Sequence, residues 1–354
     1  MFFWKQKSRD TTQPKGSDSL SPSLAANLQK LQSEIFANDE TIVYRRFKTK
    51  KPRALDCALV YADNMVKHEY LSLSVLRPMM QAEVPGSVRG RQLAHYFAEQ
   101  VIYSDDSQFA GSYSDIGDRI MEGVAVILVD GCSLGIVVDA KGWAKRAVTE
   151  PPTESVVRGP RQGFSEDLGV NISMVRLKIA SPHFKTRFLS VGTQSKTRVA
   201  IMYLENVTSM ALVEEVQRRI EQIKIDAVLD SGYIQELIQD APFSPFPTIG
   251  QTERPDVVAA KILEGRVAVL VDGSPFALTM PYLLVEAFQA NEDYYNHWII
   301  ASFHRLVRYI SFFITTSTPA LYIALISYHP QLIPTNLVVS IAAARKNTPF
   351  PGIV

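Results

Sequence analysis

Cysteine is scarce in this chain. Of its 354 residues, two carry a thiol, Cys57 and Cys132, and these lie far apart in the sequence. They form no C-x-x-C pair, which excludes a scaffold of disulfides and a zinc site built on paired thiols. Two separate thiols fit a protein that works in a reducing compartment.

An excess of charge is also absent, since 37 basic and 36 acidic residues leave a net charge of +1. This balance gives no reason to expect nucleic acid as a partner. A secretory signal is lacking as well. The apolar stretch at the N-terminus covers residues 2–4, whereas such a signal needs an apolar region of about 7–15 residues. We therefore expect the N-terminal region to stay in the cytoplasm.

The sequence motifs that mark common active sites are missing. There is no P-loop, no G-x-G-x-x-G, no H-E-x-x-H and no G-x-S-x-G. We therefore expect no catalytic activity, no cofactor and no metal. Asp130 and Asp272 each precede a glycine and are predicted to be turn residues. His304 is expected to be an interfacial residue and not a pH sensor.

One long stretch, residues 309–328, holds no charged side chain. The apolar core of a bilayer takes roughly 20 helical residues to cross, so this stretch predicts a transmembrane helix. Pro319 lies inside it and should kink it. Its hydroxyl cluster at 315–318 either faces a pore or a neighbouring helix, or bonds back to the helix backbone.

Aromatic and basic side chains precede the uncharged stretch, as they do at membrane interfaces. Lys and Arg are absent from residues 329–344, which agrees with a cytoplasmic N-terminal region. Our candidates for contact with the membrane interface are Trp298, His304, Arg305 and Arg308.

The region before this stretch contains an internal repeat. A-L-V-Y-A-D-N around Tyr61 matches A-I-M-Y-L-E-N around Tyr203, and E-G-x-x-x-x-x-V-D-G occurs at Glu122 and at Glu264. Both matches are separated by 142 positions. Two matches in one register predict two copies of one structural unit.

Each copy has the pattern helix, strand, strand, helix, an irregular stretch, helix, strand, strand. Such a mixture predicts a layered α/β fold. In the E-G…V-D-G segments, the first glycine ends a helix, the apolar run forms a buried strand, and Asp-Gly turns into the next strand. The predicted helices are 23–36, 69–80, 113–121, 165–182 and 256–263, and the strands are 41–48, 57–61, 124–129, 134–138, 183–190, 266–271 and 276–279.

The fold class is thus α/β, with two tandem copies followed by a membrane helix. The expected regions are a disordered tail (1–22), a first α/β subdomain (23–140), a linker (141–163), a second α/β subdomain (164–281), an amphipathic pre-membrane segment (282–308), the transmembrane helix (309–328), and a loop with the start of a second hydrophobic segment (329–354).

The linker between the copies is rich in proline, glycine and charge. Glu150, Glu154, Arg158 and Arg161 are our candidates for contacts between subunits. Both arginines lie beside glycines, just before a helix N-terminus. They are therefore also weak candidates for an anion site.

Several segments occur in the order that is typical of one protein family. They include T-E-P-P-T-E-S-V-V-R-G-P-R-Q-G-F-S-E-D-L, L-D-S-G-Y-I-Q-E-L-I, E-G-R-V-A-V-L-V-D-G-S-P-F and A-L-Y-I-A-L-I-S-Y-H-P-Q-L-I-P-T. From the first pair of strands to the last residue, the chain resembles the A subunit of spore germination receptors, the GerA family.

This resemblance implies a polytopic protein of the spore inner membrane that contacts membrane lipid. It implies partnership with B- and C-type receptor subunits, assembly into a homo-oligomer, and an ion channel that germinants open. Members of the family carry further membrane helices after the P-F-P motif at 349–351, whereas this chain ends at Val354. We therefore expect a fragment, a truncated product or a degenerate copy.

Two hypotheses about function follow. In the first, the chain is a subunit of a germinant receptor and acts through contacts between subunits, without catalysis. In the alternative, the duplicated unit is a small-molecule-binding sensor on a membrane anchor, whose two lobes close around a ligand about the linker.

Overall fold

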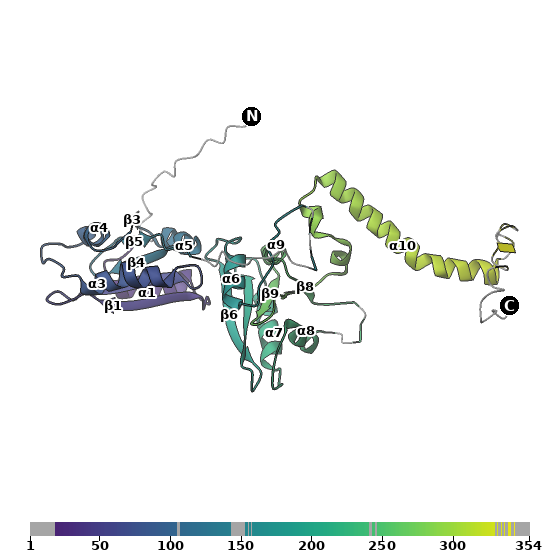
Figure 1. The fold of residues 1–354 in the computed structure, drawn as a ribbon, viewed down its shortest axis with the longest axis horizontal. Coiled ribbons are helices and arrows are strands. Elements are labelled where there is room, and N and C mark those ends of the chain that lie inside the picture. The colour runs from purple at the N-terminus through teal and green to yellow at the C-terminus, as the bar shows by residue number, and fades with distance from the viewer. Residues whose placement is uncertain are drawn as a thin grey trace, which may run out of the picture. The chain divides into compact units, whose positions relative to one another are not determined.

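The computed structural model describes residues 18–104, 107–142, 153–154, 156, 158–240, 243–244, 246–329, 331, 334, 336, 339–340 and 343. The chain divides into two units (Figure 1). The larger unit holds residues up to 156 together with Pro160–Tyr282, and so contains both predicted α/β subdomains. The smaller unit consists of Val157–Gly159 and the chain from Leu283 onward.

The first half of the larger unit is a five-stranded antiparallel sheet in the order β1-β2-β4-β5-β3. Its strands are β1 (Ile42–Lys48), β2 (Asp56–Ala62), β3 (Ser107–Ala110), β4 (Ala125–Val129) and β5 (Gly135–Val138). Its helices are α1 (Leu24–Lys30) with its π-helical continuation η1 (Leu31–Ile35), α2 (His68–Tyr70) with η2 (Leu71–Leu76), α3 (Arg77–Gln81), α4 (Arg91–Gln100) and α5 (Tyr113–Met121).

Both faces of this sheet are buried, which explains its continuous apolar strands. Alternate residues of a strand point to opposite faces. Cys57 and Leu59 of β2 pack toward α2, α3 and α4, whereas Ala58 and Val60 pack toward α1 and α5. The result is a layered α/β fold, as the sequence predicts.

The second half repeats this arrangement, with its sheet in the order β6-β7-β9-β10-β8. Helices α6 and α9 cover one face, and α7 and α8 cover the other (Figure 1). Its strands are β6 (Phe184–Val191), β7 (Thr197–Leu204), β8 (Gly250–Thr252), β9 (Val267–Val271) and β10 (Ala277–Met280), and its helices are α6 (Leu168–Arg176), α7 (Met210–Glu221), α8 (Ser231–Ile238) and α9 (Pro255–Leu263).

The repeat extends to single hydrogen bonds. The Asp130 carboxylate accepts from the backbone N–H of Leu24 at 3.0 Å, and the Asp272 carboxylate accepts from that of Leu168 at 3.4 Å. Each aspartate thus lies in the predicted turn and also binds the N-terminus of the leading helix, where a negative charge is favourable. The glycine after each aspartate has a φ of +83°, as the predicted turn requires.

The predicted tail is partly ordered. Leu20 is buried, its N–H donates to the carbonyl of Gly111, and Asp18 accepts from the hydroxyl of Ser114. Residues 1–17, part of the linker, and most of the segment 329–354 lie outside the described residues.

The smaller unit has two short 3₁₀ turns, η3 (Leu284–Phe288) and η4 (Asn291–Tyr294), followed by the long helix α10 (Trp298–Tyr328). Helix α10 contains the predicted stretch 309–328 and continues through Pro319. Within the described part of the chain, no helix has the length and apolarity that a membrane crossing requires. The helix is therefore confirmed, and the membrane crossing is not.

The hydroxyl cluster of α10 bonds to the helix itself. The side chains of Thr315, Thr316 and Thr318 donate to the carbonyls one turn earlier, at 2.7, 2.9 and 2.6 Å. The predicted bond back to the backbone is thus present at these three positions, and the arrangement that faces a pore or a neighbouring helix stays a prediction.

Candidate functional site

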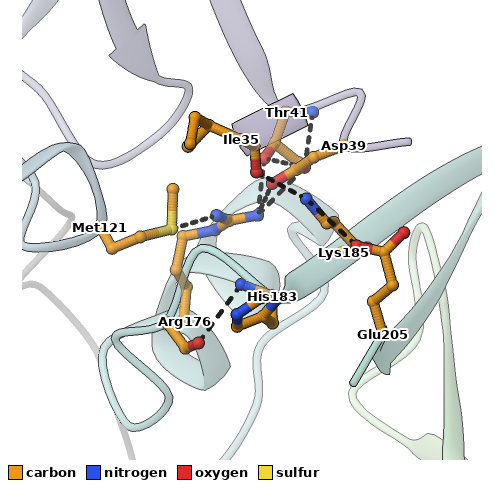
Figure 2. A network of polar contacts seen from close by, with 9 residues as sticks. Ile35, Asp39, Thr41, Met121, Arg176, His183, Lys185 and Glu205 are labelled. Carbon is orange, nitrogen blue, oxygen red and sulfur yellow. Dashed lines mark hydrogen bonds and ion pairs between the residues drawn. The ribbon is translucent and has the colours of Figure 1, made fainter. Parts of the chain in front are cut away.

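The two α/β halves are joined by a network of buried polar contacts (Figure 2). At its centre, the guanidinium of Arg176, from the last turn of α6, donates to both carboxylate oxygens of Asp39, at 3.2 and 3.0 Å. It also donates to the hydroxyl of Thr41 at 2.7 Å, and its other nitrogen lies 2.9 Å from the sulfur of Met121. The Arg176 and Asp39 side chains are only 1% and 0% exposed, so this is a fully buried ion pair.

A second cation completes the network. Lys185 of β6 donates to the carbonyl of Ile35 at 2.9 Å and lies 3.7 Å from the carboxylate of Glu205. Burial lowers the pKa of Lys185, because a charged ammonium loses its water there. Glu205 also accepts from the side-chain amide of Asn38.

The loop before β1 also covers the free edge of β6. The N–H of Glu40 donates to the carbonyl of Thr186 at 3.0 Å, and the carboxylate of Glu40 accepts from the N–H of Phe188 at 3.1 Å. An uncovered edge strand presents unpaired backbone groups to other chains. Glu40 of the first half thus satisfies two backbone groups of the second.

These contacts restrict movement between the halves. If one partner of the ion pair were removed while the halves stayed together, the other would remain as an unpaired buried charge, which costs several kcal/mol. The sensor hypothesis, in which the halves open and close around a ligand, would require these contacts to break or rearrange.

The linker is anchored to the second half through Glu154. Its carboxylate accepts from the hydroxyl of Thr252 at 2.6 Å, and its backbone carbonyl accepts from Arg254 at 3.3 Å. Arg254 is fully buried and pairs with Asp256 at 2.8 Å. Burial raises the pKa of the Glu154 carboxyl, although the bond from Thr252 acts in the opposite direction.

The other linker candidates are placed separately. Glu150 lies outside the described residues. Arg158 and Arg161 are both exposed, but Arg158 belongs to the smaller unit and Arg161 to the larger one. The structure therefore tests neither the anion site nor the subunit contacts, which stay predictions.

In the smaller unit, a second buried carboxylate holds the start of α10. Asp293 of η4 accepts from both terminal nitrogens of Arg308, at 2.7 and 2.8 Å, and from Nε of Arg305 at 3.1 Å. The Asp293 side chain is only 1% exposed. These bonds, from Arg308 above all, lower the pKa of Asp293 to about 2.

We call the contact of Asp293 with Arg305 and Arg308 the clamp, and aromatic packing supports it. Phe288 lies 5.0 Å from the rings of Tyr309 and Phe312, and its carbonyl accepts from Arg308 at 2.8 Å. Gly159 packs directly on Tyr295, because a Cβ at this glycine would lie 2.8 Å from the tyrosine ring. A piece of the linker is thus part of the base of α10.

The predicted membrane-interface residues fall into two groups. Trp298 and His304 are exposed, and their predicted contact with a membrane is not tested. Arg305 and Arg308 are half-buried and pair with Asp293, so both arginines have a partner within the chain. Within the described residues, no group of three or more His, Cys, Asp or Glu could hold a metal ion.

The fold and these contacts define a class of protein: a tandem pair of α/β units, locked by buried charges, that leads into a long C-terminal helix. The family model for the Bacillus/Clostridium GerA spore germination protein matches residues 29–354. The chain therefore belongs to the GerA family.

Several relatives are similar over most of this chain. It is 37% identical to spore germination protein KA of Bacillus subtilis (strain 168) over 335 residues, which are 95% of this chain and 61% of the relative. It is 39% identical to the uncharacterized membrane protein YfkQ of the same organism, over 95% of this chain and 64% of the relative. The chain thus spans somewhat less than two thirds of these relatives.

A solved structure shares the fold. It is the crystal structure of the N-terminal domain of the A subunit of the Bacillus megaterium spore germinant receptor GerK3. The two chains are 30% identical with a TM-score of 0.57, and the match covers 75% of this chain and 97% of the other. The predicted resemblance is thereby confirmed.

Proposed function

We propose that this chain is a subunit of a membrane-bound spore germinant receptor. In this proposal it takes part in germinant-triggered ion release through contacts with B- and C-type subunits and with further copies of itself, and not through catalysis. The observation that carries the proposal is membership of the GerA family over residues 29–354, together with the shared fold of the GerK3 A-subunit domain.

The buried networks suit a part that transmits movement. Because Arg176 and Asp39 lock the halves, a push delivered to one half moves both instead of being absorbed by closure. The clamp of Asp293 on Arg308 fixes the start of α10 to the segment before it. We propose that displacement of the larger unit reaches α10 through this segment.

The surface of α10 supports placement at a membrane, which we propose to be the spore inner membrane with the N-terminal region in the cytoplasm. Large apolar side chains stand exposed all along the helix, far more than an isolated protein leaves uncovered. Lipid or other receptor helices would cover them. They are Trp298, Ile299, Ile300, Phe303, Leu306, Val307, Tyr309, Ile310, Phe312, Phe313, Ile314, Leu321, Tyr322, Ile323 and Tyr328.

Deletion of the gene in spores of its host tests the proposal. We expect spores without it to lose cation release and germination in response to at least one germinant, and the wild-type gene to restore both. A gene with Arg218→Met, which removes an exposed ion pair on α7, should restore them equally well. Unchanged responses of the deletion strain to every germinant tried would contradict the proposal.

The sensor hypothesis has a separate test. A small molecule that binds only the folded protein raises its free energy of unfolding by RT ln(1 + L/Kd), where L is the concentration of free ligand. Thermal-shift screening of the chain with amino acids, sugars and nucleosides would reveal such a ligand. We expect no shift, because the locked halves cannot close around one.

A further inference from the structure

Helix α8 and the residues around it expose an unusual set of apolar side chains. Leu229, Tyr233 and Leu237 recur every four residues and are 69%, 47% and 51% exposed. Tyr233 and Leu237 are four residues apart within α8 and therefore lie on one helical face, whereas Leu229 precedes the N-cap residue Asp230. Phe243 and Phe246 follow the helix and are also exposed. We call these five residues the α8 surface. Scattered exposed apolar residues are normal, but a cluster of this kind marks an interaction site.

The repeat provides an internal comparison. Helix α4 occupies the corresponding place in the first half, where it packs on the same face of its sheet as α2 and α3. The outward residues of α4 are polar: Arg91, His95 and Glu99 are all exposed. The first copy thus folds with polar residues on the outer face of α4. Folding of the second copy therefore does not require apolar residues on the outer face of α8.

The segment that carries the α8 surface is acidic. Residues 226–246 contain Asp226, Asp230, Glu236 and Asp240 but no Lys, Arg or His, and Asp240 pairs with Arg219 of α7 at 2.6 Å. Glu236 is exposed next to Leu237. A surface of this sign is repelled by an anionic bilayer, whose lipids attract basic residues instead. The charge therefore favours a basic protein surface as the partner.

The same chain carries such a surface. Residues 45–53, at the end of β1 and in the turn that follows, contain six basic residues and no acidic one. Two are paired, Lys48 with Asp56 and Lys50 with Glu83. Arg46 and Lys51 are exposed and form no ion pair within the described part of the chain. We call residues 45–53 the basic turn.

Apolar area is also present near the basic turn. The N–H of Lys50 donates to the carbonyl of Ala82, directly after α3. Met80 of α3 is 48% exposed. A surface with both basic and apolar side chains complements one with acidic and apolar side chains.

We propose that the α8 surface of one copy of this chain docks on the basic turn of a second copy. This proposal rests on the proposed function, in which the receptor contains several copies. Because the two surfaces differ and carry opposite charge, the contact is head-to-tail. A two-fold contact of like surfaces would place acid on acid. Head-to-tail contacts close into rings when the rotation permits.

Self-association of the purified full chain in neutral detergent tests the docking. Sedimentation velocity over a range of protein concentrations should show concentration-dependent association that weakens as NaCl is raised, since exposed charges are screened by salt. Leu237→Ser should weaken the association about tenfold, because truncation of a buried apolar anchor is costly. Glu99→Ser on α4 is the matched control and should change nothing.

Charge reversal identifies the partner. Glu236→Lys and Arg46→Glu should each weaken association, and the chain with both changes should recover most of it, because the reversed charges again face each other. Thermal melting of each variant checks that the fold is kept. A wild-type chain that stays monomeric, or a double variant no better than the singles, would overturn the docking.

Lipid is the competing occupant, and vesicles of phosphatidylcholine with phosphatidylglycerol provide the probe. If Leu237→Ser lost vesicle binding while its association stayed at the wild-type level, the α8 surface would be a lipid contact and the proposal would be wrong. These outcomes are independent of the gene-deletion experiment. A germination defect in deleted spores, together with failed self-association, would refute only the docking.

Discussion

Replacing Arg176 by methionine is the most informative change to the larger unit. Methionine has a similar length and fits an apolar interface, but it removes the charge that faces Asp39. The Asp39 carboxylate would remain buried and would keep the hydrogen bonds that the hydroxyl and the N–H of Thr41 donate to it, at 2.7 and 3.1 Å. The halves would then meet across an uncompensated negative charge.

The size of the effect follows from the burial of both partners. Breaking a buried ion pair by removing one side costs about 3–5 kcal/mol, whereas an exposed pair contributes about 1 kcal/mol or less. For a unit of this size, a change of 1 kcal/mol shifts Tm by about 2–4 °C. We therefore expect Arg176→Met to lower Tm by roughly 6–20 °C.

Calorimetry of the chain, with two companion variants, checks this reasoning. Arg218→Met on α7 removes an exposed pair with Glu215 and should leave Tm almost unchanged. Adding Asp39→Leu to Arg176→Met should restore stability to within about 1 kcal/mol of the wild type, because an apolar pair replaces the ion pair. A double variant as unstable as the single one would show that the buried charge is not the cause.

Three further outcomes follow from the smaller unit and the linker. Because the pKa of Asp293 is lowered to about 2, the ion pair between Asp293 and Arg308 should be complete above about pH 4 and be lost as the pH falls toward 2. Hydrogen exchange of the backbone amides of residues 284–312 measures this loss. In the variant Asp293→Asn, the same amides should exchange fast already at pH 7. The pKa of Glu154 is raised, so the contact of the linker with the second half should be strongest at low pH and weaken as the pH rises through that pKa. The rate at which a protease cleaves the linker measures this contact, and Glu154→Gln should make that rate independent of pH. Gly159→Ala places a methyl group against Tyr295 at a φ of +123° and should speed exchange around that tyrosine by an amount that corresponds to about 1–3 kcal/mol.

Most of the fold could be predicted because the repeat doubles each local signal. The apolar runs of β4 and β9 are flanked in both copies by the same Glu-Gly and Asp-Gly pairs, and these pairs cap a helix and form a turn where expected. A sequence pattern that is ambiguous in one copy becomes reliable when it recurs in the second copy at the same separation of 142 positions.

The elements that sequence reasoning missed are short or weakly patterned. Strands β3 and β8 lie at the sheet edges and have four and three residues, too few to show alternation. Helices α4 and α8 lie in the stretch that we expected to be irregular. The exposed Tyr233 and Leu237 blur the amphipathic pattern of α8, because the residues that make it an interaction surface also hide its buried face.

The buried charges of the candidate site had no usable signal in the sequence. Asp39 and Arg176 are 137 positions apart and belong to no motif, so only the three-dimensional packing of the two halves brings them together. Arg308 was noted for its position before an uncharged stretch, which suggested lipid. Nothing in the sequence indicated its pairing with Asp293, fifteen positions earlier, and its predicted contact with the membrane interface stays a prediction.

Because Glu40 of the first copy bonds to strand β6 of the second, the second copy is not an independent module. Glu40 of the first copy makes two hydrogen bonds to the backbone of the β6 edge in the second, and Glu154 of the linker bonds to Thr252 of β8 at the opposite edge. A fragment that began at Pro160 would keep its own sheet but expose both margins to other chains. The compact unit therefore includes both copies, and its boundary does not fall between them.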